Sequence, residues 1–168
     1  MLTSDDALVA ALLEIERHVG TAGWDQPARL FALVPTDELL AAEPGLAAQL
    51  SAEHPAGHLS SVEQEGFHEG RDLMSALAHI AWPVTVAGCV LAVERSFLPA
   101  ALEDEIPEEG AAEFVAGHPE RHDVRVVTGA LRQGSRHSIA RLRSNPTELL
   151  GGESMVPGLA AALAATLD

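Results

Sequence analysis

The segment from Val84 to Val93, VTVAGCVLAV, constrains the fold of this chain more than any other. Almost every residue in it is apolar, whichever alternate set is taken. A strand that is apolar on both faces has to be covered on both faces, because successive side chains of a strand point to opposite sides. The segment therefore predicts a central, fully buried strand, with other elements packed above and below it.

The composition fits one folded domain with a strongly acidic surface. The chain has 168 residues, of which 47% are hydrophobic, and this length supports a single core. Its formal net charge is −15, from 25 acidic and 10 basic residues. A surface of this charge repels phosphate backbones and anionic membranes, so we expect neither nucleic acid nor membrane as a partner.

Two residue types exclude whole classes of chemistry. The chain has no lysine, so it cannot supply a P-loop lysine or a Schiff base to pyridoxal phosphate. Cys89 is the only cysteine, which rules out an intramolecular disulfide and a multi-cysteine zinc cluster. The N-terminal residues do not resemble a signal peptide, and we predict a cytoplasmic protein with no cofactor.

Helical periodicity is clearest at the two ends of the chain. Residues 5–19 place apolar side chains on one stripe, Thr3 or Ser4 can cap that helix, and Pro157 opens an alanine-rich helix at the other end. Shorter helical patterns cover residues 36–42, 69–80 and 108–116, with another short piece up to Leu50. Residues 144–151 also predict a short helix, since Pro146 follows the potential caps Ser144 and Asn145.

The clearest supersecondary signal is a β-hairpin over residues 123–144. Two strand-like runs, 123–132 and 136–143, flank Gln133-Gly134-Ser135. Alternation places Val124, Val126, Thr128 and Ala130 on one face, with Ser138, Ala140 and Leu142. The opposite face carries Arg125, Arg141 and Arg143 beside Val127, Leu131 and Ile139. A one-residue change of register would redistribute these sets.

Together these patterns predict an α+β fold in a single domain, residues 1–168. We expect an antiparallel sheet of four to five strands, with the N- and C-terminal helices packed on it. The expected strands are residues 28–34, 84–94, 123–132 and 136–143, with 59–66 as a fifth strand at an edge.

The arginines suggest a binding surface. Six of the ten lie between Arg121 and Arg143, where the local charge is +5, whereas residues 94–120 carry −7. Guanidinium groups on an open sheet face can bind carboxylates bidentately. The leading hypothesis is a non-catalytic, dimeric module that binds a protein or peptide partner through Arg125, Arg141 and Arg143. The same arginines could instead bind a small anion. Alternatively, the acidic segment of residues 94–120 could neutralise them, within the same domain or across a dimer.

The histidines suggest a second kind of site. His54 and His58 lie four residues apart and precede Glu65, His68 and Glu69, while His118 and His122 flank Pro119. Imidazole and carboxylate are common ligands of zinc and related ions. The alternative function is therefore a metal-dependent enzyme whose site is built from these two loops.

Two segments carry a family resemblance: WDQPARLFALVPT near the N-terminus, and GSRHSIARLRSNPTELLGGESMVPGLAAAL in the C-terminal third. In these segments the chain resembles a conserved actinobacterial family of proteins of unknown function. The resemblance implies a bacterial protein but supplies no site residues. At the level of fold, the expected acidic α+β domain also looks like the dimeric secretion chaperones.

Overall fold

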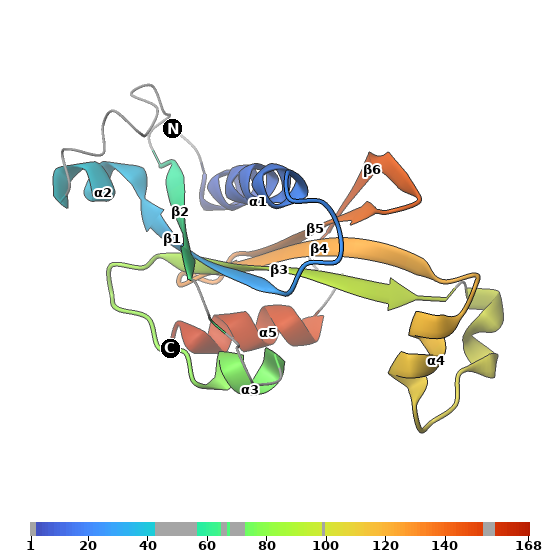
Figure 1. Ribbon diagram of the computed structural model, residues 1–168. Helices are drawn as coiled ribbons and strands as arrows, with labels where there is room; N and C mark the ends of the chain where they lie inside the picture. Colours follow the sequence, from blue (N-terminus) through green and yellow to red (C-terminus); the bar gives the residue numbers. More distant parts are fainter. Residues whose placement is uncertain (1–2, 43–56, 65–66, 68–72, 99, 153–156) are drawn as a thin grey trace.

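The computed structural model confirms an α+β fold and shows one more strand than expected (Figure 1). Its six-stranded antiparallel sheet has the order β2-β1-β3-β4-β5-β6. Helices cover both faces of this sheet. The structure describes residues 3–42, 57–64, 67, 73–98, 100–152 and 157–168.

The central strand is β3, Gly88–Phe97, which lies between β1 and β4. The prediction of a buried central strand is confirmed, but its expected bounds are wrong by four residues at the N-terminal end. Pro83 and Val86 form a turn through a backbone hydrogen bond of 3.0 Å, and Val84 is 90% exposed. At the C-terminal end the strand continues past the predicted limit at Glu94 to Phe97, because β4 pairs with its whole length. Apolar patterning does not reveal this pairing.

β1, Arg29–Pro35, pairs with β3 on one side and with β2, Leu59–Gln64, on the other. β2 is an edge strand, as the sequence predicted. In the sequence, α2, Thr36–Ala42, lies between β1 and β2 and begins directly after Pro35. The further helical piece expected up to Leu50 lies outside the described residues.

The predicted hairpin is formed by β4, His122–Leu131, and β5, Arg136–Leu142. A three-residue loop, Gln133 to Ser135, predicts that Arg132 faces Arg136. In the structure Ala130 pairs with Arg136, so the register differs by two residues from this prediction. A shift of two leaves every side chain on its predicted face, since side chains alternate with a period of two. The sets of residues assigned to each face are therefore correct.

β6, Asn145–Gly152, is a strand, so the predicted short helix over 144–151 is wrong. The strand pairs with β5 at the edge of the sheet, with a register shift at Arg141/Leu142. Local capping signals favour a helix here, but only about two turns were available. Backbone pairing with β5 overrides so short a helical preference.

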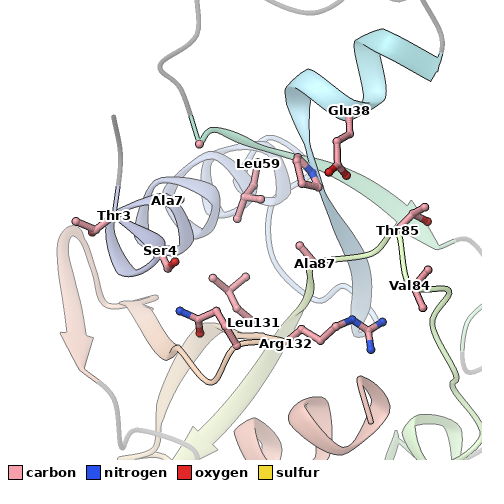
Figure 2. Close-up of a pocket in the computed structure, with 13 residues that line it drawn as sticks. Thr3, Ser4, Ala7, Glu38, Leu59, Val84, Thr85, Ala87, Leu131 and Arg132 are labelled. Atoms are coloured by element: carbon pink, nitrogen blue, oxygen red, sulfur yellow. The ribbon is translucent and has the colours of Figure 1, made fainter.

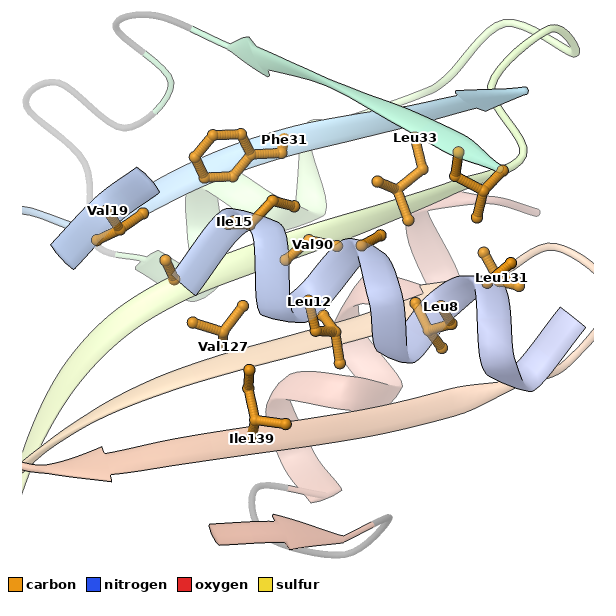
Figure 3. Close-up of a cluster of buried hydrophobic side chains, with 14 residues drawn as sticks. Leu8, Leu12, Ile15, Val19, Phe31, Leu33, Val90, Val127, Leu131 and Ile139 are labelled. Atoms are coloured by element: carbon orange, nitrogen blue, oxygen red, sulfur yellow. The ribbon is translucent and has the colours of Figure 1, made fainter. Parts of the chain in front are cut away.

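One face of the sheet is covered by α1, Ser4–Gly20 (Figure 3). The Thr3 side chain caps this helix by accepting a hydrogen bond from the Asp6 N–H, as expected. Leu8, Leu12 and Ile15 are at most 1% exposed and pack on Val90 and Val127 of the sheet. Each such buried side chain contributes about 1.5–3 kcal/mol of transfer free energy.

The other face is covered by α5, Pro157–Thr166, together with α3, Leu73–Ala78. Leu163 of α5 is fully buried against Leu91 and Cys89 of β3. A short 3-10 helix, Ala100–Glu105, and α4, Ala111–Gly117, connect β3 to β4 at one end of the sheet (Figure 1). In the described part of the chain, no helix has the length and apolar character needed to cross a bilayer.

Candidate functional site

Arg125 belongs to a buried ion-pair cluster beneath α1. Its position on β4 directs it toward the helix, as it does for Val127. Its Nη1 donates to Glu16 Oε2 at 3.0 Å, and the two side chains are 4% and 5% exposed. Its Nη2 donates to the Gly23 carbonyl at 2.7 Å, and the guanidinium lies 4.5 Å from the centre of the Trp24 ring. Arg125 is thus an internal residue.

Arg141 shares the same carboxylate. It lies opposite Arg125 on β5, and its Nε and Nη2 contact Glu16 Oε1 at 2.7 and 2.6 Å. Its side chain is 26% exposed, which leaves it accessible from one side. Glu16 therefore holds two guanidinium groups together under the last turns of α1.

Arg143 is the most exposed of the three predicted arginines, at 43%. It donates to both carboxylate oxygens of Asp25, at 3.1 and 3.3 Å, and these hydrogen bonds raise the pKa of its guanidinium. Asp123 lies 3.8 Å away, and the Trp24 ring centre lies 5.5 Å from the guanidinium carbon.

The structure therefore brings the three arginines together but corrects the idea of an open arginine face. α1 covers that face, and Arg125 cannot contact a partner or a small anion from solvent. Neutralisation by nearby acids was the alternative interpretation. The acids that contact the arginines are Glu16, Asp25 and Asp123. From the 94–120 segment, Glu94 adds a coulombic interaction with Arg143.

His58 and His122, one from each predicted histidine segment, lie at opposite ends of the sheet. His58 precedes β2 next to the Gly88 end of β3, whereas His122 pairs with Phe97 at the other end. His118 follows α4 and accepts a hydrogen bond from the Glu120 N–H. His54 and His68 lie outside the described residues. Within the described residues, no group of three or more His, Cys, Asp or Glu side chains could hold a metal ion.

His58 instead forms a polar chain that sequence reasoning missed. Its Nδ1 lies 2.6 Å from the Thr36 hydroxyl, and its Nε2 lies 3.0 Å from Glu14 Oε1. Thr36 is 2% exposed and its hydroxyl also contacts Ser60 at 2.8 Å. A hydroxyl, an imidazole and a carboxylate in a row are the groups of a hydrolytic triad. Here the Thr36 hydroxyl is shielded from solvent. The hydrogen-bonded row of Glu14, His58, Thr36 and Ser60 therefore ties α1, α2 and β2 together.

The accessible part of this region is its edge strand, β6. Its described side chains, Asn145 and Thr147–Gly151, are all exposed. Leu149 pairs with Arg141 on the α1 face, and Leu150 pairs with Ala140 on the α5 face. These leucines are 36% and 40% exposed. The outer side of an edge strand presents backbone N–H and C=O groups with no neighbouring strand to pair with.

Charge distinguishes this edge from the rest of the molecule. Residues 136–152 contain three arginines, Arg136, Arg141 and Arg143, and one acid, Glu148, which gives +2 in a chain of −15. Glu148 accepts a hydrogen bond from the Asn145 side chain at 2.9 Å. Natural edge strands are often protected by charged side chains. The described middle of β6 carries only this single charge.

The family comparison agrees with the sequence resemblance. Residues 8–168 match the family described as PPA1309-like protein, and the chain belongs to this family. No curated protein and no solved structure matches the chain. The match confirms membership of a conserved family of unknown function and carries no site residues.

Proposed function

We propose that this PPA1309-like protein is a non-catalytic interaction module that binds an extended segment of a protein partner along β6. The observation that carries the proposal is the eight-residue edge strand, whose two leucines are exposed on opposite faces of the sheet. An added strand would obtain affinity from main-chain hydrogen bonds and specificity from alternate side chains. The proposed binding surface is thus the β6 edge, with Arg141 and Arg143 beside it, in place of the open arginine-bearing sheet face that the sequence suggested.

The charge of this edge favours a neutral or acidic segment. Arg141 and Arg143 remain partly exposed beside β6, although each already contacts a carboxylate. Their guanidinium groups can donate further hydrogen bonds to the carboxylates of a bound segment, although Glu16 and Asp25 already balance their charge. Leu149 and Leu150 would then contact apolar residues that alternate along the bound segment.

A displayed library of short random peptides tests this proposal. Peptides selected on the wild-type protein should alternate apolar with neutral or acidic residues. Leu149→Asp and Leu150→Asp should each weaken their binding by about tenfold or more, because the edge loses an apolar contact and becomes acidic. Val62→Asp is the matched control, since Val62 is 42% exposed on β2 at the opposite edge.

The result that would contradict the proposal is equally specific. If the selected peptides bind Leu149→Asp and Leu150→Asp as they bind the wild type, β6 is not the binding edge. Amide chemical-shift changes confined to residues outside β5 and β6 would lead to the same conclusion. Circular dichroism should show that all three variants are folded.

The homodimer and the cytoplasmic location also remain predictions. A second copy can pair its own β6 antiparallel to the first, and the interface would then be isologous. Light scattering on the wild type and on Leu149→Asp tests this arrangement. A dimer that becomes a monomer on substitution supports it, whereas a dimer unaffected by Leu149→Asp places the interface elsewhere.

A further inference from the structure

A cavity of about 440 Å³ lies at the end of the sheet where α1 begins (Figure 2). Its walls come from segments far apart in the sequence: the first turn of α1, the β1–α2 junction, the start of β2, the chain before β3, and the end of β4. Small-molecule sites have volumes of about 300–1,000 Å³. The cavity is therefore large enough for a small ligand, and it uses none of the residues of β6.

Hydrogen bonds hold three of these walls in place. Arg132 donates to the carbonyls of Val86 and Pro83 at 3.0 and 3.1 Å, and also to the Leu167 carbonyl. The Thr36 N–H donates to the His58 carbonyl at 3.0 Å, which ties α2 to the start of β2. A wall fixed by its own polar contacts does not need to be ordered by a ligand, so binding there costs less entropy.

The lining is mostly apolar. Its apolar members are Ala7, Pro35, Leu59, Val84, Ala87 and Leu131. Val84 is 90% exposed at the rim, so a bound apolar group would cover a side chain that otherwise faces water. Ser4 and Thr85 add hydroxyl groups at the opening (Figure 2).

The lining contains one acidic and one basic side chain, Glu38 and Arg132, and they differ in whether they can pair with a ligand. Among the lining residues that the structure describes, the only acid is Glu38, and its side chain extends from α2 toward the cavity (Figure 2). Glu38 is exposed, and within the described residues its carboxylate has no hydrogen-bond or ion-pair partner. The guanidinium of Arg132 is engaged by backbone carbonyls, as described above. The net charge of −15 adds a negative potential that attracts cations.

We propose that this cavity binds a small amphiphilic cation, such as an alkylammonium or arylammonium compound. The apolar body would contact Leu59, Ala87 and Leu131, and the ammonium group would pair with Glu38 at the rim. The proposal does not depend on the binding of a partner at β6. Substitutions in β6 should therefore leave it unchanged.

Calorimetry with hexylammonium, hexanol and hexanoate tests this proposal, because the three probes share one apolar chain and differ in charge. We expect saturable binding of hexylammonium that is about fivefold tighter than that of hexanol, the size expected of one exposed ion pair. Hexanoate should bind more weakly than hexanol. Glu38→Gln should remove the preference for hexylammonium, whereas Glu113→Gln, an exposed acid in α4, should preserve it.

Location is tested separately. Hexylammonium should shift the amide resonances of Ala7, Leu59, Ala87 and Leu131 in the wild-type protein. Ser4→Trp should fill the opening and reduce the affinity for hexylammonium and hexanol alike, and Val62→Trp is the control on the exposed side of β2. The nuclear magnetic resonance mapping needs no variant, so a failure of Ser4→Trp to fold would not remove the test.

Three results would overturn the proposal. Binding of hexanoate equal to that of hexylammonium would refute the cationic specificity. A preference for hexylammonium retained in Glu38→Gln would refute the role of Glu38. Shifts spread over the surface, or the absence of saturable binding by any probe, would refute the site itself.

Discussion

At the scale of single residues, Glu16 is a buried carboxylate that joins two arginines. It is 4% exposed and carries the hydrogen bonds of both Arg125 and Arg141. Burying charge is costly unless each group is paired and hydrogen-bonded. The three side chains therefore depend on one another, and removing the central carboxylate would leave Arg125 buried without its counter-charge.

Glu16→Gln should lower the free energy of unfolding by about 3 kcal/mol or more, because it removes one partner of a buried charge pair. Urea denaturation measures this change. Glu14→Gln is the matched control on the same helix, since the Glu14 side chain is 51% exposed and pairs with His58 at the surface. It should cost about 1 kcal/mol or less. A Glu16→Gln protein as stable as Glu14→Gln would show that the buried cluster contributes no net stability.

Cys89 is the second residue with a distinctive environment. It is fully buried, and its thiol lies 3.6 Å from the Leu163 carbonyl. Burial raises the pKa of this thiol above its ordinary value, although hydrogen bonding to Thr166 opposes the shift. A buried thiol whose pKa is raised is a poor nucleophile at neutral pH.

The raised pKa of Cys89 predicts a pH-dependent stability. Below the ordinary thiol pKa of about 9, both the folded and the unfolded chains keep the proton, so stability does not change. Above it, the unfolded chain ionises first, and the free energy of unfolding falls by up to about 1.4 kcal/mol per pH unit. Denaturation between about pH 7 and pH 10 should show this decline in the wild type and a smaller decline in Cys89→Ala. Equal declines would mean that other groups cause it.

At the scale of elements, the packing of α1 on the sheet depends on a glycine. Gly129 of β4 lies under the helix, where an added Cβ would come within 2.9 Å of Leu8 and 3.0 Å of Leu12. Real Cβ atoms almost never approach another heavy atom closer than 3.0 Å. Leucine methyl groups of α1 occupy the space that a side chain at position 129 would need.

Gly129→Ala should therefore destabilise the protein by about 1–3 kcal/mol, since overpacking forces the helix or its leucines to move. Gly151→Ala is the control in a strand, because its Cβ would meet only the His137 ring at 3.6 Å and the Ser138 carbonyl at 4.0 Å. It should change stability by less than about 1 kcal/mol. Thermal and urea denaturation of both variants check this prediction. A neutral Gly129→Ala would show that α1 is free to shift.

At the scale of the whole molecule, charge is unevenly distributed. The chain carries −15, yet residues 136–152 have a balance of +2 and the connection between β3 and β4 is strongly acidic. Self-repulsion among like charges destabilises a compact state and is screened by salt. The acids of the β3–β4 connection include Glu108 and Glu109, which are both exposed.

Raising sodium chloride from about 0.02 to about 0.2 M should raise the melting temperature, because it shortens the screening length from roughly 20 Å to below 10 Å. Differential scanning calorimetry measures this rise. A Glu108→Gln/Glu109→Gln variant should melt higher at low salt and respond less to added salt. If the melting temperature falls instead, attractive ion pairs such as Arg29–Glu63, with 2.6 Å between Nε and Oε2, outweigh the repulsion.

Much of the fold could be predicted from the sequence because it depends on local periodicity. The alternation in residues 123–143 assigned every side chain of the hairpin to its correct face, and the stripe in residues 5–19 identified α1. Apolar character on both faces identified β3 as central. The α+β class followed from the same local patterns, whereas the family was identified by resemblance and confirmed by the match over residues 8–168.

Only the tertiary structure decided which faces are covered and which ends meet. Nothing local to Arg125 or Arg141 shows that Glu16, more than a hundred residues away, lies above them. The contact of Thr36 with His58, the cavity at the start of α1, and the strand conformation of β6 likewise depend on segments distant in sequence. The periodicity of a sequence predicts which side chains share a face. Whether that face is buried, and which strand pairs with it, depends on the element that packs against it.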